Sequence, residues 1–151
     1  MRAIVQRVSE ARAVIDGETV GAIGPGMLVL VCAMPGDGTT TADRLLDKLL
    51  KLRIFQNAAG KLDHSLSDMD GEGRVGGLLL VSQFTLAADL SGGNRPSFKA
   101  AAPPTEAQAL FTHLVTQARA RHANVASGRF AADTRVHLVN DGPITIPLDI
   151  S

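Results

Sequence analysis

The most uniformly apolar segment of the chain is Gly77–Val81, and the polar sequence SQFTL follows it directly. A short apolar run that begins at glycines is typical of a strand buried on both faces. Continued alternation would place Ser82 and Phe84 on one face of the sheet, and Gln83 and Thr85 on the other. Because open α/β sheets bind ligands at the carboxyl ends of their strands, these residues are candidates for a site. Strand-end polar groups that only satisfy neighbouring backbone are an equally good interpretation.

Alternation elsewhere predicts a sheet that is interrupted by two amphipathic helices. Asp16-Gly17 between two alternating runs predicts a two-residue hairpin turn, and Pro147 marks the last run as an edge strand or a bulge. The polar, glycine-rich segment 61–76 is predicted to be a loop. Further strands are expected at 3–8, 11–15, 18–20, 27–33, 54–55, 124–126, 135–139 and 144–150, with helices from Thr40 or Thr41 to Arg53 and from Pro103 to His122.

These elements predict an α/β fold in which residues 1–151 form a single compact domain, with a mixed, barrel-like β-sheet core and two main helices. The lone Cys32 lies in an apolar run and is interpreted as a small buried hydrophobic residue. The sequence GEGRVG at 71–76 matches a dinucleotide-binding fingerprint in letters only. It precedes a strand, whereas the fingerprint must follow one, so it is interpreted as a loop.

Composition narrows the possible partners. Fifteen basic residues balance fifteen acidic ones, and the chain has neither Trp nor Tyr. This argues against a protein that coats long nucleic acids or stacks many bases, although not against one that grips the tip of an RNA. No apolar span approaches twenty residues, so a soluble cytoplasmic protein without a membrane partner is expected. The histidines lack metal-ligand spacing, and neither a metal nor another cofactor is expected.

A second candidate segment is the sequence NDGPIT at 140–145. Asp141-Gly142 is sufficient to explain it as a hairpin turn between two strands. Pro143 is less ordinary there, because it removes a ladder donor and restricts the residue before it. An X-Pro bond also adopts the cis form at a cost of only about 0.5–1 kcal/mol.

Together, SQFTL at 82–86 and NDGPIT at 140–145 closely resemble the two signature motifs of the D-aminoacyl-tRNA deacylases. Shorter matches occur at 6–8 (QRV), 95–98 (RPSF) and 128–130 (GRF), so the resemblance covers essentially the whole chain. It implies a homodimeric editing enzyme that hydrolyses the ester between a D-amino acid and the acceptor end of tRNA. It also implies activity on mischarged glycyl-tRNA and rejection of L-aminoacyl-tRNA.

The resemblance implies roles for individual residues. Backbone amides of Phe84 and Thr85 would stabilise the oxyanion while the terminal 2′-hydroxyl of the tRNA assists, with the Thr85 hydroxyl as the alternative catalytic group. Ser82, Gln83 and Phe84 would bind the substrate. Gly142-Pro143 would be a cis peptide whose carbonyl groups enter the active site of the other subunit and exclude L-amino acids.

Arg7, Arg95 and Lys99 are weaker candidates for contacts with tRNA phosphates, and surface charge alone explains them equally well. Two rival functions remain open at this point. One is a nucleic-acid-binding module without hydrolytic activity, and the other is a general acyl hydrolase that uses Thr85 or Ser82.

Overall fold

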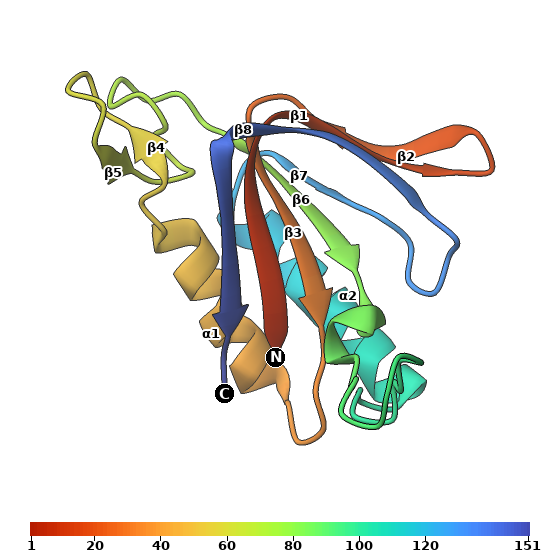
Figure 1. Cartoon of the computed structure of the whole chain (residues 1–151). Helices are drawn as coiled ribbons and strands as arrows, with labels where there is room; N and C mark the ends of the chain where they lie inside the picture. The colour runs from red at the N-terminus through yellow and green to blue at the C-terminus, as the bar shows by residue number, and fades with distance from the viewer.

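The computed structural model describes residues 1–151, and its longest strands lie at the two ends of the chain. These strands, β1 and β8, pair antiparallel along most of their length. Both chain ends consequently lie side by side in Figure 1. The elements in chain order are β1 (Arg2–Ile15), β2 (Glu18–Ile23), β3 (Gly26–Cys32), α1 (Thr39–Lys51), β4 (Phe55–Gln56), β5 (Leu62–His64), β6 (Gly77–Ser82), η1 (Phe84–Ala87), α2 (Pro104–Arg121), β7 (Val125–Ser127) and β8 (Arg135–Asp149).

The main sheet has the order β2-β1-β3-β6-β7, and β8 pairs with β1. β3, β6 and β7 are parallel, whereas the other pairings are antiparallel, so the sheet is mixed. The strands curl until β2 meets β7, where a Cβ atom at Gly21 would lie 2.6 Å from the Ser127 carbonyl oxygen. The sheet is therefore a nearly closed barrel, which confirms the predicted fold class. The hairpin is also confirmed, because Asp16 and Gly17 both have positive φ, as its turn requires.

Helices α1 and α2 cover the same face of the sheet and lie behind it in Figure 1. Leu45 and Leu49 of α1 and Leu114 of α2 are fully buried in the core between the helices and the sheet. Burial of each such leucine contributes roughly 2 kcal/mol. The predicted start of α1, at Thr40 or Thr41, is one or two residues late, because the helix begins at Thr39 with Gly38 as its N-cap. The Thr41 side chain instead accepts a hydrogen bond from the Gly38 amide at 3.2 Å, from inside the first turn.

The segment predicted as a loop at 61–76 contains structure that its composition hides. β5 pairs with β4 in a small second sheet, and Leu66 and Met69 are buried in the main core. Two short strands with little alternation give too weak a pattern to detect. His122, at the end of α2, is buried and bonded through Nε2 to the Gly76 carbonyl oxygen at the end of this segment, at 2.6 Å.

β8 differs from the prediction of two strands joined by a turn. Residues 135–149 form one strand whose two halves, 135–140 and 145–149, both pair with β1, while residues 141–144 between them have no partner on β1 and the register shifts on either side of Val8. The hairpin interpretation of Asp141-Gly142 is therefore wrong. The chain changes direction midway along β8 without leaving β1 (Figure 1). Pro147 lies on an edge strand as predicted, since β8 pairs only with β1.

Candidate active site

The polar segment after β6 leaves the sheet sooner than alternation predicts. The Gln83 amide extends the ladder by one bond, to the Val31 carbonyl oxygen at 2.7 Å, and residues 84–87 then form the 3₁₀ helix η1. Phe84 and Thr85 consequently do not occupy alternating faces of a strand. The reason is local, because Ala87 turns back into the core, where it is 1% exposed.

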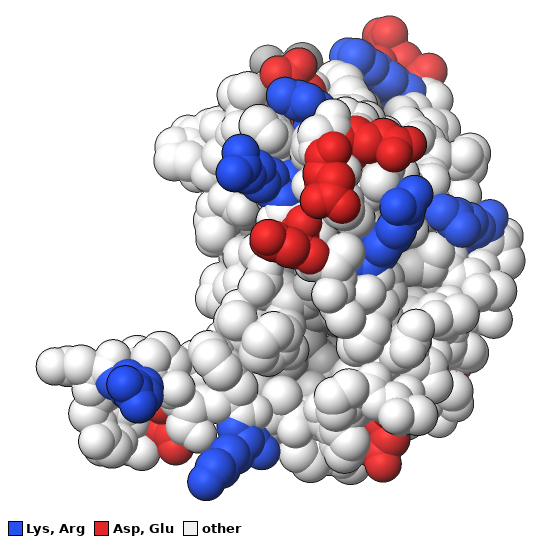
Figure 2. All heavy atoms as spheres, turned by 90° about the vertical axis from the view of Figure 1, so that its right-hand side faces the viewer, with Lys and Arg blue, Asp and Glu red and all other residues white.

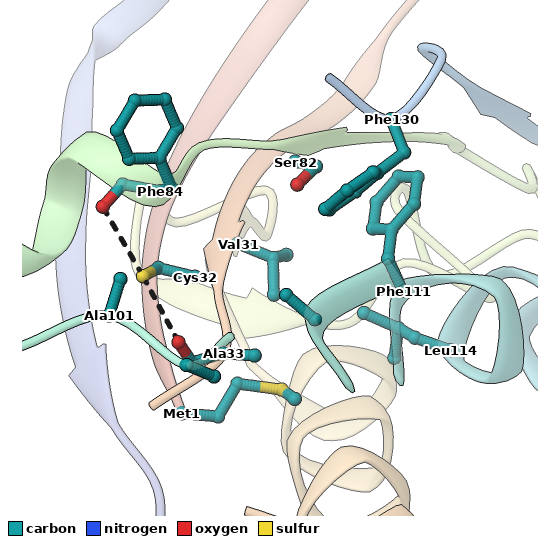
Figure 3. A pocket seen from close by; sticks show the side chains of 12 residues that line it. Met1, Val31, Cys32, Ala33, Ser82, Phe84, Ala101, Phe111, Leu114 and Phe130 are labelled. Carbon is teal, nitrogen blue, oxygen red and sulfur yellow. Dashed lines mark hydrogen bonds between the residues drawn. The ribbon is translucent and has the colours of Figure 1, made fainter. Parts of the chain in front are cut away.

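This turn leaves two backbone donors free. The first amides of a 3₁₀ helix have no acceptor within the helix, and those of Phe84 and Thr85 donate no hydrogen bond within the chain. The Phe84 carbonyl oxygen lies 3.6 Å from the Cys32 thiol inside the protein (Figure 3). Because a trans peptide is planar, with its carbonyl and amide pointing in opposite directions, the Thr85 amide points away from Cys32.

The side chains of this segment hold one another in place. The Gln83 side-chain amide donates to the Thr85 hydroxyl oxygen. Ser82 is half-buried and lines the same cavity as Phe84. The Thr85 hydroxyl therefore accepts from an amide, and the Gln83 amide nitrogen that it contacts is not a base that could activate a nucleophile.

A pocket of about 660 Å³ opens beside η1, a size typical of small-molecule sites. Its walls are formed by 81–84, 98–99, 101–104 with Ala107, and 130–134 with Val136. Figure 2 shows the side of the molecule that lies to the right in Figure 1, where a hollow is surrounded by mostly uncharged surface. Lysine, arginine, aspartate and glutamate are interspersed around it, so neither sign of charge dominates.

Two aromatic rings stand exposed in the wall of this pocket. Phe84 is 57% exposed and Phe98 is 37% exposed, and their rings make an edge-to-face contact with centroids 5.2 Å apart. Exposed rings in contact with each other offer a surface on which a planar base stacks. Lys99 also lines the pocket, and Arg95 is exposed on the same loop.

Beneath the pocket lies a closely packed apolar floor (Figure 3). Val31, Phe111, Leu114 and Phe130 surround a gap of only about 20 Å³ there. Cys32 is 2% exposed in this floor, in agreement with its interpretation as a buried hydrophobic residue. Burial raises the pKa of its thiol, although the nearby Arg2 guanidinium acts in the opposite direction. The thiol is therefore protonated at neutral pH and able to donate a hydrogen bond.

The Gly142-Pro143 segment lies far from the pocket of its own chain. Through the strand pairings, Gly142 is level with residues 77–79 of β6, three strands away, whereas the pocket begins at the other end of β6. The separation is roughly 15 Å or more. Gly142 and Pro143 are exposed, and Gly142 has φ of +112°.

The expected cis peptide is not found, because every peptide bond in the structure is trans. Trans is the more stable form of an X-Pro bond. The Gly142–Pro143 bond lies at an exposed position of the edge strand β8.

Arg7 is also placed differently from the prediction. It is 5% exposed, so it does not reach a phosphate at the surface. Its guanidinium donates to the Ile54 carbonyl oxygen at 2.9 Å and the Asp141 carbonyl oxygen at 3.2 Å. The Asn140 side-chain amide completes the arrangement with bonds to the Arg7 and Ile144 carbonyl oxygens. Arg7 and Asn140 therefore hold the exposed residues 141–143 in one conformation.

Replacing Arg7 with alanine is expected to lower the free energy of unfolding by about 2–4 kcal/mol, because the buried Ile54 carbonyl oxygen and the partly buried Asp141 carbonyl oxygen both lose a charged donor. Urea denaturation measures the difference. Arg12→Ala is the matched control, since Arg12 is an exposed arginine on the same strand. A change no larger for Arg7→Ala than for this control would contradict the assigned contacts.

Part of the pocket was not foreseen from the sequence. Residues 131–134 form one wall, and Ala131 has a positive φ of 60°, which is unusual for a residue other than glycine. No pattern in AADT distinguishes it from an ordinary loop, and only the preceding GRF match pointed to this region.

Nowhere do three or more His, Cys, Asp or Glu side chains gather in a way that would hold a metal ion. None of the helices combines the length and apolar composition needed to cross a membrane.

Comparisons with known proteins agree on one family. The family profile described as D-Tyr-tRNA(Tyr) deacylase matches residues 4–149. The chain is 62% identical to the D-aminoacyl-tRNA deacylase of Polaromonas naphthalenivorans over 151 residues, which cover 100% of this chain and 98% of the relative. It is 60% identical to the D-aminoacyl-tRNA deacylase of Delftia acidovorans, with 100% of this chain and 97% of the relative covered.

Two solved structures are also similar. The c-Myc DNA Unwinding Element Binding Protein aligns with a TM-score of 0.88 and 35% identity, over 99% of this chain and 98% of that one. A probable eukaryotic D-amino acid tRNA deacylase aligns with a TM-score of 0.75 and 19% identity over the same shares, and at that identity it supports the fold alone.

Proposed function

Because the chain belongs to the D-aminoacyl-tRNA deacylase family and is a hydrolase, we propose that it hydrolyses the ester joining a D-amino acid to the acceptor end of tRNA. The reaction releases free tRNA and amino acid and edits mischarged tRNA in the cytoplasm. One observation carries the proposal: η1 begins with the free Phe84 and Thr85 amides, and its first residue, Phe84, lines a pocket of about 660 Å³.

The pocket suits the end of a tRNA. Phe84 and Phe98 offer their exposed rings to the terminal adenine, while Ser82 and Gln83 line the wall beside them. Lys99 in the pocket and Arg95 nearby are placed to meet one or two phosphates. The interspersed charges around the hollow suit a partner held at its tip (Figure 2).

An aminoacyl ester is already activated, so positioning and charge stabilisation supply the catalysis. Water attacks the carbonyl carbon, and the Phe84 and Thr85 amides bind the oxyanion that forms. The intermediate then collapses, and the bond from the carbonyl carbon to the ribose oxygen breaks. The neighbouring 2′-hydroxyl relays a proton from the attacking water to that ribose oxygen. No side-chain base takes part.

The Thr85 hydroxyl is the less favourable catalyst. A threonine nucleophile needs an adjacent base, whereas the Gln83 side-chain amide donates to this hydroxyl. His113 and His122 are engaged elsewhere, with Asp43 and with the Gly76 carbonyl oxygen.

Selection between D- and L-amino acids is assigned to Gly142 and Pro143 of a second subunit. Because they lie far from the pocket of their own chain, they act on the pocket of another copy. They are exposed but held rigid by Arg7 and Asn140, as a steric barrier must be. Such a barrier excludes the L side chain and admits a D-amino acid or glycine, and it makes the homodimer the active form.

Deacylation of one tRNA charged separately with D-Tyr and L-Tyr, together with a glycyl-tRNA, tests the proposal. The D-tyrosyl and glycyl esters are expected to be cleaved about 100-fold or more faster than the L-tyrosyl ester. A terminal 2′-deoxyribose should abolish cleavage. Equal cleavage of a small chiral ester without RNA would favour a general acyl hydrolase instead.

The similarity to the c-Myc DNA Unwinding Element Binding Protein favours a second function, binding nucleic acid without hydrolysis. Such binding would weaken steeply with salt, because it would neutralise many phosphates. Engagement of an acceptor end alone gives a shallow salt dependence. A folded protein that binds nucleic acid steeply with salt and cleaves none of the three esters would establish this alternative.

A further inference from the structure

The oxyanion amides assigned above depend on the orientation of η1, and a four-residue helix does not fix its own orientation. Its entry is held by the Gln83 amide on the Val31 carbonyl oxygen at 2.7 Å. The Cys32 thiol contacts the Phe84 carbonyl oxygen in the middle. This second contact is weak, because the single thiol hydrogen also has the Ala33 carbonyl oxygen within 3.5 Å (Figure 3).

The exit of η1 is held by a stronger donor from another strand. Arg2 Nη1 donates to the Leu86 carbonyl oxygen at 3.2 Å. That oxygen has no partner within η1, because the Asp89 amide that would continue the turn donates to the Ser97 carbonyl oxygen. A guanidinium makes a charge-assisted bond, which is stronger than a thiol contact.

We infer, on the basis of the function proposed above, that Arg2 is a positioning residue for the deacylation reaction. It anchors the carboxyl end of η1 to β1 and so fixes the direction of the Phe84 and Thr85 amides, with Cys32 as a weaker second anchor. Arg2 lines a shallow depression with Leu86 and Pro147, outside the catalytic pocket, so it does not touch the reacting atoms.

The partial exposure of Arg2 separates this role from a purely structural one. If Arg2 is removed, water reaches the Leu86 carbonyl oxygen, so folding is retained while η1 loses its anchor. The oxyanion charge develops on the way to the tetrahedral intermediate and is absent from the bound substrate, so the loss falls on kcat rather than on KM.

Arg2→Ala is expected to lower kcat about tenfold or more, with KM for D-tyrosyl-tRNA within about twofold and the thermal midpoint little changed. Arg2→Lys, which keeps a charged donor, is expected to restore most of kcat. The matched control is Arg44→Ala, because Arg44 also donates to a backbone carbonyl, that of Ser151 at 3.0 Å, on α1 away from η1. That control should retain wild-type kcat.

The outcomes are distinct. Wild-type kcat in a folded Arg2→Ala protein would overturn the inference while leaving the proposed function intact. A higher KM with unchanged kcat would also overturn it, by making Arg2 a tRNA contact. If Arg2→Ala does not fold, kcat is compared between Arg2→Lys, which keeps a charged donor, and Arg2→Gln, which has a neutral one. The inference predicts the higher kcat for Arg2→Lys, and equal or reversed values would contradict it. Failure of the wild-type protein to cleave D-tyrosyl-tRNA would refute the proposed function itself.

Discussion

Removing the amide hydrogen of Thr85 is expected to lower kcat about 10²- to 10³-fold, the usual effect of losing one oxyanion donor. Replacing the residue with its α-hydroxy acid analogue turns the amide into an ester and leaves the side chain in place. Because the Thr85 amide donates no hydrogen bond within the chain, its removal should not destabilise the fold. Single-turnover deacylation of D-tyrosyl-tRNA measures the change, and KM should be nearly constant.

Thr85→Val is the matched control for this experiment. It removes the hydroxyl, keeps the amide, and is expected to retain kcat within about fivefold, since only the bond from the Gln83 side chain is lost. The opposite pattern, an inactive valine variant and an active ester variant, would make the Thr85 hydroxyl the catalytic group.

Replacing Pro143 with alanine is expected to leave a folded dimer whose D-over-L preference falls about 100-fold, through faster L cleavage or slower D cleavage. Alanine restores a backbone donor and frees φ at an exposed position, so the barrier loses its fixed shape. Rates for D- and L-tyrosyl-tRNA, measured in parallel, give the ratio. Pro147→Ala is the matched control, because Pro147 is exposed on the same strand, and it should keep wild-type selectivity.

Mixed dimers test whether Pro143 acts across the subunit boundary. A dimer of one Pro143→Ala subunit and one subunit with the ester at residue 85 has one site with both features intact, if Pro143 acts on its partner. Such a dimer should recover roughly half of the selective activity. No recovery above the two parent dimers would place Pro143 in the site of its own chain, contrary to the strand register.

The sequence predicted most of the elements that bury apolar surface. The run at 77–81 and the helix containing Leu45, Leu49 and their neighbours are confirmed because periodicity reports burial directly. Periodicity does not report where a strand stops when the next residues have high β-propensity. The continuation of β6 into residues 83–85 was therefore expected, whereas the burial of Ala87 turns the chain into η1.

Long-range contacts account for the other differences. An Asp-Gly pair usually makes a hairpin, but β1 is long enough to pair with both halves of β8, and Arg7 and Asn140 stabilise the irregular segment between them. From the sequence, Arg7 is interpreted as a phosphate contact or a surface charge. Its burial follows from partners at Ile54 and Asp141, which are 47 and 134 residues away and invisible to any local pattern.

The use of backbone donors in η1 also has a genetic consequence. A codon change alters a side chain and, proline aside, leaves the amide in place, so most missense mutations at 84 and 85 leave both proposed oxyanion donors present. Harmful alleles should therefore concentrate in the residues that orient η1, in the walls of the pocket, and in substitutions by proline. The codon for Thr85, whose side chain has no assigned catalytic role, should therefore tolerate variation that the codon of a nucleophilic residue does not.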